Sequence, residues 1–432
     1  MMKISEMPKY EVYKDSGVEW LGDIPASWSL LANKHIFRLK KKQVGKRSSE
    51  YDLLSLTLRG VIKRDMENPE GKFPAEFDTY QEVQCGDFIF CLFDVEETPR
   101  TVGLSPFNGM ITGAYTVFEL NDNFDNRFLY YFYMNLDAKK MLKPLYRGLR
   151  NTIPKDSFLS FKTFVPPHEQ QTRIANFLDK KTALIDEAIS IKEQQISLLK
   201  ERKQIIIQQA VTQGLDPNVP MKDSGVDWMG KIPQHWKLKP NKCLFKLKKS
   251  LVGKRSGDYE LLSLTLKGII KRDMDNPEGK FPAEFNTYQE VSVGDFVFCL
   301  FDVEETPRTV GLSKFNGMIT GAYTVFELDE SVSKEFLYYF YLNLDSRKMM
   351  RPLYKGLRNT ISKETFLSFK SFIPPLKEQE EIVDFIEYEV NKIDLTIDGI
   401  SEQIDKIKEY KSCLINGSVT GKIKVTSEMA ER

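Results

Sequence analysis

The chain has few residues of the kinds that build catalytic or metal sites. Its 432 residues include 3 histidines and 5 cysteines, and no phosphate-binding GxxxxGK[ST] or GxGxxG loop occurs. No stretch approaches the roughly 20 apolar residues of a membrane span. Residues 1–6 lack an apolar signal region, so we expect a cytoplasmic protein. The formal net charge is only +1, so total charge does not indicate a nucleic-acid partner.

Glycine and proline are also missing from residues 169–212 and are scarce in 377–420. Both stretches are rich in Leu, Ile, Glu and Lys, which predicts two long helices. Apolar residues recur at alternating steps of four and three, as in a coiled-coil stripe. The second stripe reads Ile386, Val390, Ile393, Ile397, Ile400, Ile404, Ile407, Lys411 and Leu414. The first reads Leu178, Thr182, Ile185, Ile189, Lys192, Ile196, Leu199, Lys203 and Ile206. We expect the helices to pair with each other; the alternative is that each lies on its own domain.

The chain is an internal duplication with a constant offset of 208 residues. Gly45-Lys46-Arg47 recurs as Gly253-Lys254-Arg255, and Trp20 recurs as Trp228. A period this long indicates a duplicated gene half and not a solenoid. The predicted order is a first domain at 1–167, a central helix at 168–213, a second domain at 214–375, a distal helix at 376–420 and a tail at 421–432.

Each domain is predicted to be mixed, which gives an α+β chain of two repeated α/β domains. Residues 53–61, 88–93 and 115–120 are typical of strands, and residues 128–142 are typical of a helix whose aromatic residues belong to the core. The fold class is therefore two mixed domains, each followed by a long helix, with the helices pairing as an antiparallel coiled coil.

The duplication tests the candidate catalytic groups. His35 becomes Cys243, His168 becomes Leu376, and His235 corresponds to Ser27, so no histidine is present in both copies. A histidine-based catalytic site working in both halves is excluded. Only Cys91 and Cys299 repeat among the cysteines, without the spacing of a zinc site. The acidic residues Asp94, Glu96 and Glu97, repeated as Asp302, Glu304 and Glu305, form either a solvated turn or a metal site.

Basic residues are concentrated in three runs per domain, which favours phosphate contacts. Arginine and asparagine also read base edges in the major groove. The DNA-contact candidates of the first domain are Lys40, Lys41, Lys46, Arg47, Arg59, Lys63, Arg64, Arg100, Arg147, Arg150 and Asn151. Those of the second are Lys248, Lys249, Lys254, Arg255, Lys267, Lys271, Arg272, Arg308, Lys355, Arg358 and Asn359.

Repeated motifs at both ends of each domain carry a family likeness. Residues 16–28 and 224–236 share Ser-Gly-Val-(Glu/Asp)-Trp-(Leu/Met)-Gly-x-Ile-Pro-x-x-Trp. Each domain then ends with Gly-Leu-Arg-Asn-Thr-Ile, a Pro-Pro pair and a Gln-x-x-Ile-x-x-Phe helix start. In these motifs and in its order of elements, nearly the whole chain resembles the specificity subunit of type I restriction-modification systems. It departs from the family's usual pattern because its two domains are nearly the same.

The resemblance implies a DNA-reading subunit of a phage-defence system that has no catalysis and no cofactor of its own. Each domain would be a target-recognition domain for one half of an interrupted site on double-stranded DNA. The helices would act as a spacer and dock two modification subunits, which carry S-adenosylmethionine; restriction subunits with Mg and ATP would complete the complex. The resemblance carries over Arg150-Asn151 and Arg358-Asn359 as DNA contacts. Two other functions stay open: a coiled-coil scaffold that binds protein, and a nuclease that uses the acidic cluster.

Overall fold

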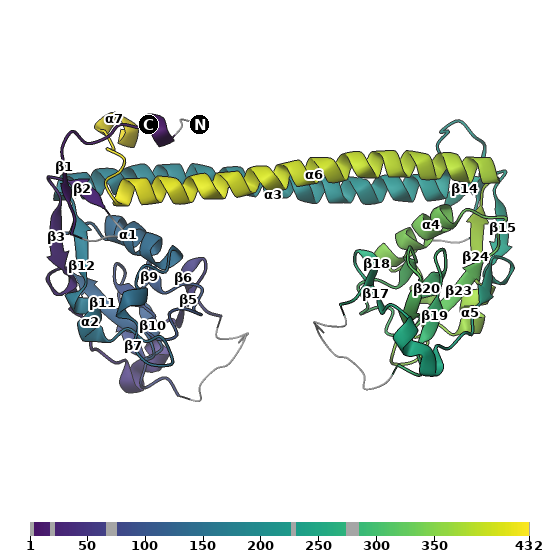
Figure 1. Ribbon diagram of the computed structural model, residues 1–432, viewed down its shortest axis with the longest axis horizontal. Helices are drawn as coiled ribbons and strands as arrows, with labels where there is room; N and C mark the ends of the chain where they lie inside the picture. Colours follow the sequence, from purple (N-terminus) through teal and green to yellow (C-terminus); the bar gives the residue numbers. More distant parts are fainter. Residues whose placement is uncertain (1–3, 18–21, 66–75, 226–229, 274–284, 432) are drawn as a thin grey trace. The chain divides into compact units, whose positions relative to one another are not determined.

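The computed structural model describes residues 4–17, 22–65, 76–225, 230–273 and 285–431 (Figure 1). They form two compact units: unit 1 lies within 1–192 and 402–432, and unit 2 within 193–401. Each unit holds one globular part and one half of each long helix, α3 (His168–Gln213) and α6 (Leu376–Val419). Trp20 and Trp228, which repeat in the opening motif, lie outside the described residues.

The globular parts repeat the same elements in the same order. In unit 1 these are β1 (Tyr13–Asp15), β2 (Asp23–Pro25), β3 (Ser29–Ala32), β4 (Phe37–Leu39), β5 (Leu54–Thr57), β6 (Gly60–Lys63), β7 (Gln81–Val83), β8 (Phe88–Phe90), β9 (Val102–Leu104), β10 (Gly109–Ile111), β11 (Thr116–Leu120), α1 (Asn126–Ala138), α2 (Lys155–Ser160) and β12 (Lys162–Val165). A short helix, α7 (Ser427–Glu431), follows α6.

In unit 2 they are β13 (Met221–Asp223), β14 (Lys231–Pro233), β15 (Lys237–Pro240), β16 (Phe245–Leu247), β17 (Leu262–Thr265), β18 (Gly268–Lys271), β19 (Gln289–Val291), β20 (Phe296–Phe298), β21 (Val310–Leu312), β22 (Gly317–Ile319), β23 (Thr324–Leu328), α4 (Lys334–Ser346), α5 (Lys363–Ser368) and β24 (Lys370–Ile373). The predicted plan of two mixed repeats with two long helices is therefore confirmed.

The centre of each globular part is a four-stranded antiparallel sheet, in the order β4-β11-β8-β9 in unit 1 and β16-β23-β20-β21 in unit 2. Successive side chains of a strand point to opposite faces. Phe88 and Phe90 therefore enter the main core with α1, whereas Ile89 enters a smaller core with β5 and β6. The sheet therefore has apolar packing on both faces. Burying one such aromatic side chain stabilises the fold by about 1.5–3 kcal/mol.

Helix α1 begins at Asn126 because Asp125 caps it: the Asp125 side chain accepts from the backbone N–H groups of Arg127 and Phe128. It ends at Ala138, four residues before the predicted end. Phe128 and Phe132 are buried in the core, as predicted, and the helix lies between the sheet and the long helices (Figure 1).

The predicted strand at 53–61 is wrong in one respect. The structure has a hairpin there: β5 and β6 pair antiparallel, and Leu58 and Arg59 form the turn between them. Gly60 permits the turn because its φ of 98° lies in the left-handed region, which residues with a side chain rarely adopt. The apolar run hid this turn, and the structure places Arg59 at a hairpin tip.

A buried glutamine ties each long helix to its globular part. The Gln171 side chain accepts from the backbone N–H of Asp125 at 2.9 Å and donates to the carbonyl of Pro166 at 2.9 Å. Gln379 makes the same two bonds, with Ser333 and Pro374. Buried polar groups need such partners, so the glutamine of the helix-start motif fixes where α3 or α6 leaves the domain.

Within each unit α3 and α6 pack antiparallel, as predicted. In unit 1 the ammonium groups of Lys411 and Lys192 reach Asp186 at 2.7 Å and Gln403 at 2.6 Å. In unit 2 Lys203 reaches Asp394 at 2.7 Å. Every lysine that interrupts the apolar stripes therefore has a polar partner on the opposite helix.

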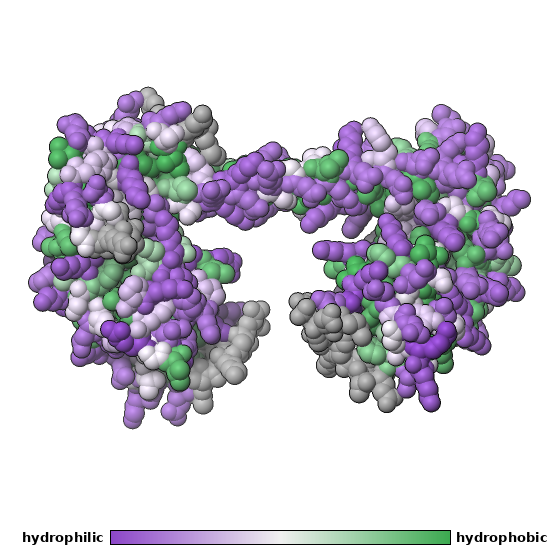
Figure 2. All heavy atoms as spheres, viewed as in Figure 1, coloured by the Kyte–Doolittle hydropathy of each residue, from purple (hydrophilic) through white to green (hydrophobic). Residues whose placement is uncertain are grey.

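Among the described residues no helix is both long enough and apolar enough to cross a membrane. On the face shown in Figure 2, hydrophilic residues cover most of the visible surface of both units. Hydrophobic residues on that face lie in small separate groups.

Candidate nucleic-acid interface

Three candidate residues, Arg147, Arg150 and Asn151, lie on a tight loop between Arg147 and Thr152. The two residues exchange backbone hydrogen bonds of 2.8 and 3.0 Å, which closes the loop. Gly148 and Asn151 both have positive φ, 67° and 43°, a conformation that glycine and asparagine tolerate best. The side chain of Leu149 at the tip is fully exposed. The second copy has the same closure between Lys355 and Thr360 and a fully exposed Leu357.

Arg150 is held by a carboxylate that the sequence did not assign to it. Its Nε and Nη2 lie 3.1 and 2.5 Å from the two oxygens of Asp94, and its backbone carbonyl accepts from Asp94 N–H. The guanidinium also lies 5.7 Å from the Phe93 ring centre, within cation–π range. The hydrogen bond from Arg150 lowers the pKa of the Asp94 carboxyl, so the pair stays charged at neutral pH.

The arginine nonetheless remains open to a ligand. Its side chain is 70% exposed, and a guanidinium has five N–H donors, so the bonds to Asp94 do not use them all. Arg358 repeats the arrangement with Asp302 and Phe301 at 3.1, 2.5 and 5.5 Å. Each unit therefore presents one pre-oriented arginine beside one exposed leucine.

A second basic tip lies on the β5–β6 hairpin. Arg59 and Leu58 are exposed at this tip, and Arg100 donates to the backbone carbonyl of Leu58 at 3.1 Å. The segment 94–100 therefore contacts both tips, through Asp94 at one end and Arg100 at the other. In unit 2 Arg308 donates to the carbonyl of Leu266, beside Lys267. Arg100 and Arg308 support the hairpin, and Arg59 and Lys267 face outward.

Two candidates are buried and paired inside the domains. Lys40 is 8% exposed, and its ammonium lies 2.7 Å from Asp87. Lys248 pairs with Asp295 at the same distance, with 13% of its side chain exposed. A buried charge needs its partner, so neither lysine is available to a phosphate and we withdraw both as DNA contacts. Lys41 and Lys249, the next residue in each copy, are exposed instead.

The remaining candidates are surface cations with weak partners. Arg47 and Arg255 lie 5.9 and 5.7 Å from the ring centres of Tyr51 and Tyr259. Lys63 pairs with Asp52 at 2.5 Å. Exposed pairs of this kind contribute about 0–1 kcal/mol, so a phosphate could replace the partner. Lys46, Lys254 and Arg147 are exposed, as are Lys355 and Lys271, whereas Arg64, Arg272, Asn151 and Asn359 are half-buried.

Two of the three acidic residues in each copy of the cluster are paired with cations. Asp94 binds Arg150, and Glu96 lies 2.7 Å from Lys143; in the copy Glu304 pairs with Arg351. Within the part of the chain that the structure describes, no group of three or more His, Cys, Asp or Glu side chains could hold a metal ion. The cluster therefore positions cations on the basic loops.

Comparison with known proteins gives the same two-part division. The family model of the type I restriction modification DNA specificity domain matches residues 102–201 and again residues 310–406. The two matches begin 208 residues apart, which is the offset of the internal repeat.

Solved structures share the fold. A chain from a structure of the type I R-M system, determined to explain complex assembly and conformational transition, superposes with a TM-score of 0.66 at 12% identity. The alignment covers 92% of this chain and 98% of that one. The HsdS subunit from Thermoanaerobacter tengcongensis has a TM-score of 0.49 at 14% identity, over 93% of this chain and 98% of its own. The chain therefore contains two type I restriction modification DNA specificity domains, and it shares its fold with a chain of a type I R-M system.

Proposed function

We propose that this subunit reads an interrupted, palindromic DNA site with two nearly identical target-recognition domains, residues 1–167 and 214–375. The observation that carries the proposal is the repeated arginine loop. Arg150 and Arg358 have matching carboxylate partners and distances, so the two loops should read the same bases. Residues 168–213 and 376–420 would serve as the spacer, and residues 421–432 as a tail.

The exposed cations would divide into two groups. Lys41, Lys46 and Arg47, with their copies, would contact phosphates, which position a protein without reading sequence. Arg150, Asn151 and their copies would contact base edges. Leu149 and Leu357 would meet an apolar surface such as a thymine methyl group. Leu149→Ala should then relax one position of one half-site, and an unchanged recognition sequence would rule this contact out.

The partners follow from the family. Two modification subunits would dock on the helix pair and supply S-adenosylmethionine, and restriction subunits would bring Mg and ATP. The complex would act in the cytoplasm, where DNA is accessible to it. This chain itself would supply only DNA contacts and docking surfaces.

Salt dependence of DNA binding tests the proposal. The purified complex of this chain with its modification subunits should bind a target duplex with an affinity that falls steeply with salt, because phosphate contacts release counterions. A protein scaffold would show no such binding. A magnesium-containing assay with plasmid tests the nuclease alternative: we expect uncut plasmid from the purified chain.

A further inference from the structure

One aromatic position of the repeat is buried in unit 1 and open in unit 2. Phe177 on α3 is 2% exposed, whereas Phe385, its copy on α6, is 40% exposed. The two residues occupy the same position after the same buried glutamine. The difference must therefore come from what covers the helix.

In unit 1 the cover is the two ends of the chain. Phe177 lines a cavity of about 510 Å³ together with Met7 from the first segment and Met429 from α7. The backbone N–H of Lys424 donates to the carbonyl of Pro8 at 2.7 Å, which joins the two ends.

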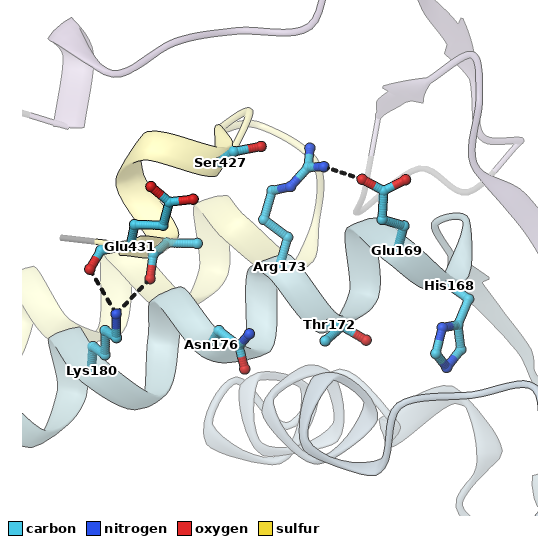
Figure 3. Close-up of a pocket in the computed structure, with 9 residues that line it drawn as sticks. His168, Glu169, Thr172, Arg173, Asn176, Lys180, Ser427 and Glu431 are labelled. Atoms are coloured by element: carbon cyan, nitrogen blue, oxygen red, sulfur yellow. Dashed lines mark hydrogen bonds and ion pairs between the residues drawn. The ribbon is translucent and has the colours of Figure 1, made fainter.

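The covering helix is acidic, and the surface beneath it is basic. Helix α7 has the sequence Ser-Glu-Met-Ala-Glu. Lys180 donates to the carbonyls of Ala430 and Glu431 at 2.9 and 2.8 Å, at the end of α7 where the helix dipole favours a cation (Figure 3). Arg173 and Lys180 line one side of the cavity of about 670 Å³ between α3 and α7. In unit 1 this position of the repeat is therefore covered by a short helix, α7, whose charge is opposite to that of the α3 surface beneath it.

The corresponding surface of unit 2 has the opposite charge. Five residues that face or flank α7 in unit 1 become acidic or aromatic in α6: Thr172 corresponds to Glu380, Arg173 to Glu381, Asn176 to Asp384, Lys180 to Tyr388 and Lys181 to Glu389. The large side chains among them stay uncovered. Tyr388 is 65% exposed. Leu395, which lies two helical turns further along α6, is 73% exposed.

We propose that this open face of α6, formed by Glu380, Glu381, Asp384, Phe385 and Tyr388, binds a short basic amphipathic helix of a partner protein. Two observations define the occupant. The apolar stripe at helical spacing needs an apolar cover, and α7 shows that one short helix is enough for the position. The acidic residues require lysine or arginine on that helix. Helix α7 of a second copy is a poor occupant, because it is acidic and like charges repel.

Two peptides in trans test this surface on the full-length chain. One has the sequence of residues 421–431, and the other carries Glu428→Lys and Glu431→Lys; both have photo-methionine at position 429. After irradiation, the crosslinked residues are mapped by mass spectrometry. The basic peptide should label residues 376–395 about tenfold more than the native peptide. Each of its two new lysines can form an ion pair with the acidic face, and each such pair contributes a small amount of binding free energy.

A charge-swapped chain is the matched control. Glu380→Thr, Glu381→Arg, Asp384→Asn, Tyr388→Lys and Glu389→Lys give α6 the residues that α3 carries. These side chains are exposed or half-buried, so the melting temperature should change little. The preference should reverse, with the native peptide, which has two fewer lysines and two more glutamates than the basic one, now labelling residues 376–395 more. Equal labelling by both peptides, no labelling, labelling elsewhere, or a swap without effect would each overturn the proposal. The test needs no DNA, so it is independent of the proposed reading function.

Discussion

The reading loops and the long helices have diverged to different degrees within one chain. Arg150 and Arg358 keep the same carboxylate partner at the same distances. On the helices, Arg173 has become Glu381 and the cover over Phe177 is missing from Phe385. The duplication therefore retained the residues that we propose to contact DNA and changed the helix surface that we propose to bind a partner protein. We expect two equal readers whose helix ends offer unequal surfaces.

The largest effect should follow from removing the reading arginines. Arg150→Ala or Arg358→Ala should relax discrimination in one half-site by about 1–3 kcal/mol, the free energy of one bidentate base contact. The double variant should lose discrimination in both. Binding of target and random duplexes by each variant measures this. Equal losses of affinity for the two duplexes would show that these arginines contact phosphates, and would rule out that they read bases.

The two halves of the chain should differ as isolated fragments. Residues 216–432 should dimerise more tightly than residues 1–215 through self-pairing of their long helices. Lys203 corresponds to Lys411 and Asp186 to Asp394, so the pairs Lys203–Asp394 and Lys411–Asp186 are copies of one another. Each homodimer could therefore form an equivalent lysine–aspartate pair between its two helices. Lys192 lies in the stripe of the first helix where the second has Ile400, and a lysine at such a position weakens association.

Sedimentation of both fragments measures this difference, and we expect about a tenfold gap in dissociation constant. With its modification subunit, the second fragment should direct methylation to a palindromic version of the site. A monomeric second fragment would contradict the antiparallel pairing of the helices.

A smaller effect should follow from releasing the arginine without removing it. Asp94→Asn leaves Arg150 charged but takes away its carboxylate, so discrimination should fall severalfold while nonspecific affinity is kept. Because the folded-state pKa of Asp94 is lowered, its charge persists as pH falls and is lost only below its ordinary range. Discrimination should therefore be constant from about pH 5 to about pH 8. A loss of discrimination within that window would exclude Asp94 as the positioning group.

The smallest effect concerns neighbouring lysines. Lys41→Ala should weaken binding to all sequences and reduce the salt slope by about one. Lys40→Ala is the matched control: it leaves the buried Asp87 carboxylate without its cation, with only the Gln84 N–H as donor, so it should lower the melting temperature and leave the salt slope unchanged. The reverse pattern would return Lys40 to the DNA interface.

Much of the fold was predictable because the repeat and the apolar stripes record it directly. The charge runs were less informative, since Lys40 and Lys41 are adjacent and follow the end of β4, yet one forms a buried ion pair and the other is exposed. Asp94 lies 56 residues from Arg150, so no local pattern connects them. The exposure of Phe385 was also unpredictable: it depends on where the tail packs, and the helix sequence does not encode that.

The methylation motif in cells carrying this chain and its modification subunit tests the central claim most directly. If two equal readers bind DNA with matching two-fold symmetry, the site should be an interrupted palindrome, with half-site centres about one helical turn apart. Arg59 becomes Lys267 and Arg147 becomes Lys355, so a difference of one base pair between the halves is compatible with the account. Sequencing for methyladenine should therefore return two matching half-sites. Two unrelated half-sites would contradict it.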